Sequence, residues 1–182
     1  MRHRVFIAIN LPEDIKRKLV SEQEEIDALF DISPIRWTKR DNLHITLAFL
    51  GYIKDKKLVE VCQLTKSAVQ KIEPFFLNLT KICYGPFGKM PPRMIWVQVE
   101  KSKELGLLHC ELEAMGWASA NFSPHITLGR IRTWQWRQIN PEERPEIEKE
   151  ISLSFKVDSI EVMESKLKRQ GPNYSMLQSV KL

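Results

Sequence analysis

Apolar residues along the chain recur with two different spacings, and these spacings divide the sequence into predicted strands and helices. An apolar run at residues 5–9 predicts a buried strand, and a β-branched run at 43–50, bounded by Gly51, predicts another. Alternation of apolar and polar residues indicates half-buried strands, because successive side chains of a strand point to opposite faces. This alternation occurs at 75–80, 95–99 and 151–157, continues through Ile160 and Val162, and returns at 174–180 after a turn at 171–173.

Helical spacing of apolar residues marks three other segments. The second and third predicted helices begin at Asp55 and after a Ser102 cap, and they end before Pro74 and at Gly116. The first predicted helix begins at Pro12 and ends by residues 33–34, and its apolar stripe is Ile15, Leu19, Ile26 and Leu29.

The order of these elements repeats within the chain. A turn-rich segment at 85–92 predicts a surface loop between two halves, and each half contains a strand, a helix and a second strand. The polar segment 134–150 predicts a loop or a short helix. Several strands with three helices that do not alternate with them one for one are typical of an α+β fold.

The two halves also share a word. HITLAFLG starts at His44 and HITLGRIR starts at His125, so each copy of His-Ile-Thr-Leu opens a predicted strand. At average residue usage, a chance repeat of Ile-Thr-Leu after a second histidine has odds of roughly one in a thousand. The repeat therefore indicates two copies of one structural unit.

Composition places the chain among globular proteins. It has 182 residues, enough for one domain or one compact pair of lobes, and 43% of them are hydrophobic. The apolar run near the start is too short for a signal peptide, and no later run has membrane-spanning length. Cys62, Cys83 and Cys110 are widely spaced without a C-x-x-C pair, which favours reduced, buried thiols in a cytoplasm. We expect a monomer without a membrane partner.

The net charge of +5 is compatible with an anionic partner such as nucleic acid. The basic residues are spread along the chain without a long run, so a solvated, lysine-rich surface explains the charge equally well.

A His-x-Thr word on a strand suits acid-base chemistry. His44 and Thr46 share one face, as do His125 and Thr127, while the intervening isoleucine faces the other way. If the halves are related by a pseudo-twofold axis, two imidazoles and two hydroxyls meet across a cleft. One neutral imidazole can take a proton from water while a protonated one gives a proton to the leaving oxygen, and the hydroxyls can hold phosphate oxygens. This in-line hydrolysis of a phosphodiester needs neither metal nor cofactor.

Other readings of the histidines are weaker. His3 at a frayed terminus and His109 in a helix lack the strand context and are interpreted as structural or surface residues. Zinc binding by His44 and His125 has little support, because no third histidine and no carboxylate has ligand spacing.

The two words and their surroundings resemble the paired H-x-T-L motifs of the 2H phosphoesterase superfamily, in particular its RNA 2′,3′-cyclic phosphodiesterase branch, historically called 2′-5′ RNA ligase. The similarity extends over nearly the whole chain, through VFIAINLP, IRWTKRDNLHITLAFLG, PRMIWVQV, FSPHITLGRIR and MESKLKRQGPNYSMLQ.

The resemblance implies one bilobal domain over residues 1–182, with an antiparallel sheet in each lobe, helices on the outer faces and both motifs in a central cleft. It implies hydrolysis of RNA 2′,3′-cyclic phosphate ends to 2′-phosphate, with His44 as acid and His125 as base, although the sequence does not fix which is which. It also implies that Arg130 binds phosphate and that Phe49 stacks on a base. Strict alternation along each strand places Arg130 and Phe49 on the apolar face. Arg130 therefore reaches the cleft only if a bulge at Gly129 breaks the alternation. A core position explains Phe49 equally well, and the same holds for Trp37.

Two other functions remain open from the sequence. One is a different cyclic or 2′-5′ phosphodiester as substrate, including ligation of tRNA halves. The other is an RNA-binding module that recognises a phosphorylated end without turnover. The sequence does not specify the physiological RNA.

Overall fold

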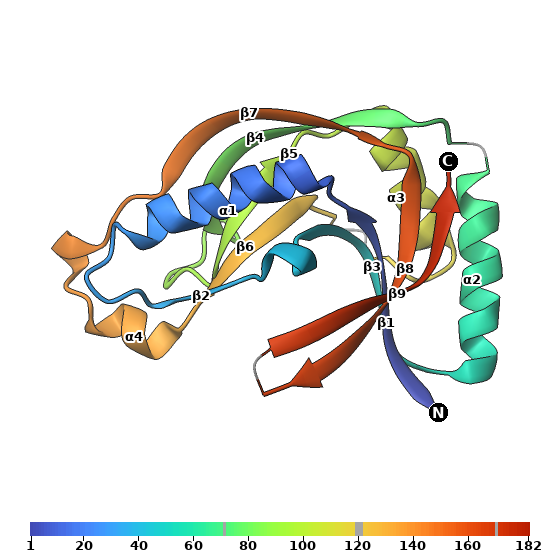
Figure 1. The fold of residues 1–182 in the computed structure, drawn as a ribbon, viewed down its shortest axis with the longest axis horizontal. Helices are drawn as coiled ribbons and strands as arrows, with labels where there is room; N and C mark the ends of the chain where they lie inside the picture. Colours follow the sequence, from blue (N-terminus) through green and yellow to red (C-terminus); the bar gives the residue numbers. More distant parts are fainter. Residues whose placement is uncertain (71, 119–121, 170) are drawn as a thin grey trace.

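A single antiparallel sheet forms the centre of the computed structural model, which describes residues 1–70, 72–118, 122–169 and 171–182 (Figure 1). Within these residues the sheet has nine strands in the order β7-β4-β5-β6-β3-β1-β8-β9, and β2 pairs with β6 beside this path. The strands are β1 (Arg2–Asn10), β2 (Ile35–Trp37), β3 (His44–Lys54), β4 (Phe75–Gly85), β5 (Met94–Val99), β6 (His125–Ile131), β7 (Glu148–Val157), β8 (Ser159–Lys168) and β9 (Gly171–Lys181).

The helices of the described residues include three long ones and three short ones. They are α1 (Glu13–Asp27), α2 (Asp55–Val69), α3 (Lys103–Ala114), α4 (Thr133–Gln138) and the 3₁₀ turns η1 (Arg40–Asn42) and η2 (Pro141–Glu143). None of the helices in the described ranges is long and apolar enough to cross a membrane.

The two repeated words meet at the middle of the sheet. β3 and β6 are antiparallel neighbours that pair through Ile45 and Ile126, the second residue of each word. β3 follows β1 and α1, and β6 follows β5 and α3, so the predicted strand-helix-strand order is confirmed in both halves. The α+β class is confirmed as well.

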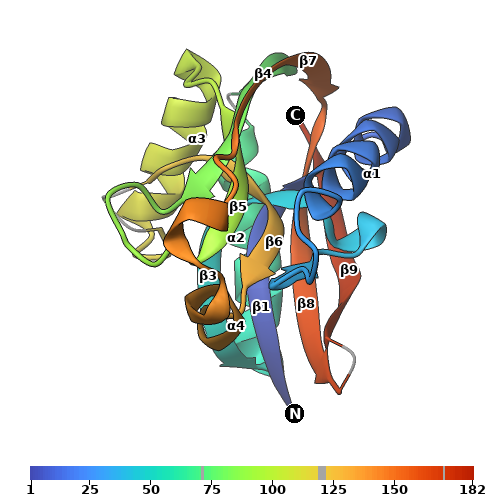
Figure 2. The ribbon, with the colours of Figure 1, turned by 90° about the vertical axis from the view of Figure 1, so that its left-hand side faces the viewer.

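The long helices pack against the strands from two sides. α1 contacts β6, whereas α2 contacts β1, β3, β8 and β9, and α3 contacts β3 and α2. Figure 2 shows α1 and α3 on opposite sides of the molecule, with the central strands between them. The apolar residues of both words lie in the main core, as alternation predicts: Ile45, Leu47, Ile126 and Leu128 are all buried.

Two element ends differ from the sequence-based expectation. The first helix ends at Asp27, so Leu29, placed on its apolar stripe, lies beyond the helix and is exposed. The predicted stop at Gly51 is wrong, because β3 continues to Lys54 against the start of β1. Gly51 adopts φ 68° within the strand, a conformation that glycine tolerates without a Cβ penalty.

Two features of the sheet could not be predicted from the spacing of apolar residues. The alternation that continues from 151 to 162 is interrupted at Asp158, and the two resulting strands lie far apart in the sheet, since β7 pairs with β4 while β8 pairs with β1. β2 was not predicted, because its three residues are too few to establish a period. α4 falls in the segment expected to be a loop or short helix.

Two other expectations need correction. Of the three free thiols, only Cys83 is buried, since Cys62 is half-buried and Cys110 is exposed. His3 is not frayed: it lies in β1 opposite Ile53, and its ring nitrogens contact Glu164 at 2.7 Å and Asp55 at 2.8 Å. These carboxylates, Asp55 foremost, raise the pKa of His3.

Candidate active site

A β-bulge in β3 decides which side chains share a face with His44. In the pairing of β3 with β1, Ala8 lies opposite Thr46 and Ile7 lies opposite Ala48, which leaves Leu47 as an extra residue. The extra residue reverses the alternation, because paired residues of neighbouring strands point to the same side. Phe49 therefore lies opposite Phe6 on the face of His44 and Thr46, and it is exposed, not buried in the core.

The second word contains the same bulge at the equivalent residue. Trp96 lies opposite Thr127 and Ile95 lies opposite Gly129, so Leu128 is the extra residue. Arg130 is thereby brought to the face of His125 and Thr127, where it is exposed. The predicted bulge is confirmed, although it centres on Leu128 and not on Gly129.

Gly129 has a different reason to be glycine. A Cβ at this position would lie 2.5 Å from the Ile35 side chain and 2.9 Å from the Trp37 ring. The glycine thus lets β2 approach β6 closely. Trp37 packs against the core and its indole N–H donates to Asp27 at 2.7 Å, so this tryptophan has a structural role.

Both histidines are held in the same way. The Nδ1–H of His44 donates to the carbonyl of Asn42, and that of His125 donates to the carbonyl of Ser123, each at 2.7 Å. A carbonyl only accepts hydrogen bonds, so Nδ1 carries the proton and Nε2 is left with a lone pair. In His44 this Nε2 accepts a hydrogen bond from the Thr46 hydroxyl at 2.9 Å.

The rings around the two imidazoles differ. The His44 ring packs against Phe6, with centroids 5.0 Å apart, and against Tyr174, whose ring meets it edge-on at 5.3 Å. The His125 ring is stacked face to face on Trp96 at 3.9 Å. Each imidazole is therefore fixed by a backbone carbonyl and by aromatic packing, which limits its rotation.

Arginine side chains gather around this face. Arg36 lies opposite Arg130 across the β2–β6 pair, so both point to the same side. A Cβ at Gly171, which has φ 114°, would lie 2.6 Å from Nη2 of Arg36, so the first residue of β9 lies close to that guanidinium. Arg4 reaches Ser165 at 3.5 Å on the neighbouring β8. The histidine pair is therefore surrounded by positively charged side chains.

The electrostatics of the site favour neutral imidazoles. Burial lowers the pKa of His44, and the charge of a protonated His125 lowers it further. Burial also lowers the pKa of His125, and Arg130 adds to this effect. The hydrogen bonds to Asn42 and Ser123 act in the opposite direction. Burial raises the pKa of the Tyr174 phenol, while Arg130 and Arg4 oppose that rise.

Several residues of this face were missed by sequence reasoning. Trp96, Tyr174, Arg36 and Arg4 come from four strands, and their position depends on strand pairing that no local pattern records. Ser123 and Asn42 contribute carbonyl groups, which leave no signature in residue type. His109 was correctly separated from the site, since it is buried in α3 and stacks on Phe122 at 4.3 Å.

A metal centre is not evident in the described ranges, where no group of three or more His, Cys, Asp or Glu side chains is placed to hold an ion. The groups that converge on this face are two imidazoles, hydroxyls and guanidinium groups. Such a set can exchange protons and bind an anion.

Comparison with known proteins finds the same duplication. The family described as LigT-like phosphoesterase matches twice, at residues 9–96 and 97–174. The prediction of two copies of one unit is confirmed, although the two matches meet inside β5 and not in the loop at 85–92.

Similar proteins cover nearly the whole chain. An RNA 2′,3′-cyclic phosphodiesterase of Thermotoga maritima is 30% identical, with 96% of this chain and 92% of the relative aligned. One from Methanocaldococcus jannaschii is also 30% identical, with 96% and 98% aligned. The crystal structure of TT0787 from Thermus thermophilus superposes with a TM-score of 0.80 at 26% identity, covering 98% of this chain and 97% of that one.

Proposed function

The chain belongs to the LigT-like phosphoesterase family, and from this premise we propose that it hydrolyses the 2′,3′-cyclic phosphate end of an RNA to a 2′-phosphate. One observation carries the proposal: two histidines on neighbouring strands present their Nε2 atoms on one face, each locked through Nδ1 to a carbonyl. The relatives named as RNA 2′,3′-cyclic phosphodiesterases support the same substrate class.

We propose that residues 1–182 act as one bilobal domain with the reaction in a cleft between its halves. The strands β7, β4, β5 and β6 form one half and β3, β1, β8 and β9 the other, joined at Ile45 and Ile126. Extending this register by one residue sets His44 opposite Thr127 and His125 opposite Thr46. The two histidines are then diagonal neighbours about 7–8 Å apart, a span that accommodates one phosphorus between the imidazoles.

In this mechanism His125 is the base and His44 is the acid. Nε2 of His125 takes a proton from water, the water oxygen attacks phosphorus, the P–O3′ bond breaks, and Nε2 of His44 gives its proton to O3′. Arg130 supports this assignment, because its permanent positive charge opposes protonation of His125. The charge of His125 acts on His44 only while His125 is protonated, so a neutral base leaves the acid free to hold its proton.

The remaining predicted residues bind the substrate. The hydroxyls of Thr46 and Thr127 donate to nonbridging phosphate oxygens. Arg130 adds a charge-assisted hydrogen bond as negative charge develops in the pentacoordinate transition state. Phe49 is exposed on the same face, which suits stacking against the terminal base.

Substrate binding would also prepare the acid. In the free protein the pKa values of both histidines lie below the usual value near 6.5, so both are neutral at pH 7. A bound phosphodiester is an anion, and a nearby negative charge favours the protonated imidazole. The substrate thereby raises the pKa of His44 at the moment when the proton is needed.

The direct test uses a short RNA with a 2′,3′-cyclic phosphate end and protein treated with EDTA. We expect the product mass to rise by one water, and phosphorus NMR to identify the 2′-monoester. Absence of turnover together with tight, salt-sensitive binding would instead identify a module that only recognises RNA ends. A 3′-phosphate product would reverse the assignment of the leaving oxygen.

A further inference from the structure

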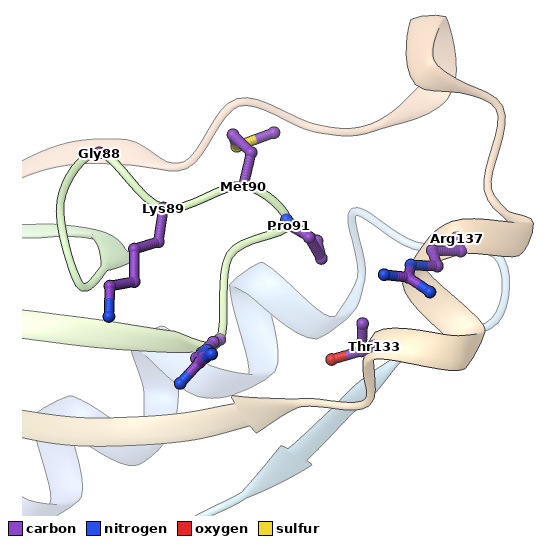
Figure 3. A pocket seen from close by; sticks show the side chains of 7 residues that line it. Gly88, Lys89, Met90, Pro91, Thr133 and Arg137 are labelled. Carbon is purple, nitrogen blue, oxygen red and sulfur yellow. The ribbon is translucent and has the colours of Figure 1, made fainter.

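A basic surface pocket of about 400 Å³ lies beyond the end of β6 and was not predicted from the sequence (Figure 3). It is formed by the loop before β5 and by α4, and Figure 3 shows Thr133 and Arg137 of α4 facing Pro91 of the loop. Its lining residues are Gly88, Lys89, Met90, Pro91, Arg93, Thr133 and Arg137. Three of them are cations and none is acidic.

The cations of this pocket have no anionic partner in the described part of the protein. Lys89, Arg93 and Arg137 take part in none of its salt bridges, which engage Lys81 and Lys149, for example, with glutamates. A second surface pocket, near α1 and β7, offers a contrast, because its Lys18 and Lys149 lie among Glu22 and Glu150. Like charges gathered without counter-charges create a positive potential that attracts an anion.

The basic pocket is joined to the candidate active site through packed side chains. Phe87, one residue before the pocket lining begins, meets the Trp96 ring edge-on at 6.2 Å, and Trp96 stacks on His125. The guanidinium of Arg130 on β6 also contacts Sδ of Met94 on β5 at 3.6 Å, and Met94 directly follows Arg93 of the pocket. β6 itself leads from His125 past Arg130 to Thr133.

We propose that this pocket binds a backbone phosphate of the RNA upstream of the reacting end. The inference rests on the proposed function, because a 2′,3′-cyclic phosphate terminates the strand and the rest of the RNA must leave the site in a single direction. Thr133 is the eighth residue after His125, at most about 26 Å away along an extended chain. Phosphates of one strand are about 3.4 Å apart along a duplex and farther apart in an extended strand, so this span covers roughly four to seven nucleotides.

Exposed aromatic residues flank the same path. Phe87 lies between His125 and the pocket, and Trp134 follows Thr133; both rings are more than half exposed. Exposed rings beside cations are the usual composition of a single-stranded nucleic-acid surface, because bases stack on the rings while phosphates contact the cations. The pocket chemistry therefore favours RNA over an acidic protein segment.

The test compares two substrates in the full-length protein: a nucleoside 2′,3′-cyclic monophosphate and an eight-nucleotide RNA with the same end. In the double variant Arg93→Ala, Arg137→Ala we expect KM for the RNA to rise about tenfold and kcat to stay unchanged. The salt dependence of RNA affinity should fall by about 0.7 in slope, since the pocket neutralises one phosphate of a single strand. Turnover of the monophosphate should not change, because it does not reach the pocket.

A matched control is Lys66→Ala, Lys103→Ala, which removes two exposed cations from α2 and α3 and should affect neither substrate. Equal KM values for the RNA in the pocket variant and the wild type would overturn the inference, as would an equal loss on both substrates.

Equilibrium binding of a fluorescent RNA with a 2′-phosphate end repeats the comparison without turnover. If the wild type hydrolyses neither substrate, the proposed function fails, and the binding difference between pocket and control variants still decides whether the pocket holds RNA.

Discussion

The two His-Ile-Thr-Leu words have the same backbone geometry, but different side chains surround their histidines. In both, the histidine Nδ1–H donates to the carbonyl two residues earlier, the isoleucine pairs at the sheet centre, and the leucine forms a bulge. The fifth residue after each histidine is thereby turned to the histidine's own face. That residue is Phe49 in the first word and Arg130 in the second.

The difference indicates how a duplicated unit acquires two roles. The first copy surrounds its imidazole with Phe6 and Tyr174, whereas the second stacks its imidazole on Trp96 and adds the cation of Arg130. We propose that the shared features position the imidazoles, whereas the unshared ones separate the proton acceptor from the proton donor and the nucleobase side of the site from the phosphate side. The following changes test this division, from the largest expected effect to the smallest.

Removing either imidazole should have the largest effect, because the proposed reaction uses both. His44→Ala and His125→Ala should each lower kcat/KM by about 10²-fold or more on a cyclic-phosphate RNA. His3→Gln, a histidine in the ion pairs of β1, serves as the control and should retain the wild-type rate. Near-full activity in either alanine variant would refute two-histidine catalysis.

The pH profile should reveal the influence of Arg130 on its own copy. Because both histidine pKa values in the free protein are lowered, kcat/KM should be greatest below pH 6.5 and fall about tenfold per pH unit above it, as the acid loses its proton. Arg130→Gln removes the charge that opposes protonation of His125, so the pKa of this base should rise and the acidic limb should move to higher pH.

The same variant should also lower kcat/KM by roughly tenfold at the optimum through the lost contact to phosphate. Steady-state rates from pH 4.5 to 8.5 check both effects, with Arg17→Gln, an exposed arginine of α1, as the control. An unmoved acidic limb would show that His125 is not the base or that Arg130 does not act on it.

The hydroxyls should matter less than the imidazoles and about equally in the two copies. Thr46→Val and Thr127→Val remove one donor each while preserving side-chain shape, and each should lower kcat about tenfold with little change in the melting temperature. Thr65→Val in α2, whose hydroxyl donates to the Val61 carbonyl, is the control for the loss of a buried hydroxyl. A larger loss of stability than of rate would assign the two threonines to the fold.

The smallest expected effect belongs to the aromatic fifth residue. Phe49→Leu should raise KM about fivefold and leave kcat and the pH profile unchanged, because a stacked base contributes to binding and not to proton transfer. Phe76→Leu, another exposed phenylalanine, is the control. If KM for Phe49→Leu matches the wild-type value on RNAs ending in each of the four bases, Phe49 is not the base platform.

The sequence predicted most strands and helices and the two His-x-Thr pairs, but alternation along a single strand was an insufficient guide to the side chains of the site. Strict alternation placed Phe49 and Arg130 in the core, and the two bulges reversed this. A bulge depends on how a neighbouring strand pairs, so residue types in β3 alone do not reveal it. Asp158 repeats the point, since the separation of β7 from β8 follows from pairing with different strands.

By itself the sequence determined the duplication, the α+β class and the two His-x-Thr pairs, because these depend on local periodicity and on residue chemistry. Only the tertiary structure decided which carbonyls hold the imidazoles, which rings flank them, and that Arg4, Arg36 and Arg130 surround one face. Those contacts join residues from distant parts of the chain, and the free energy that selects them comes from burial and pairing across the whole sheet.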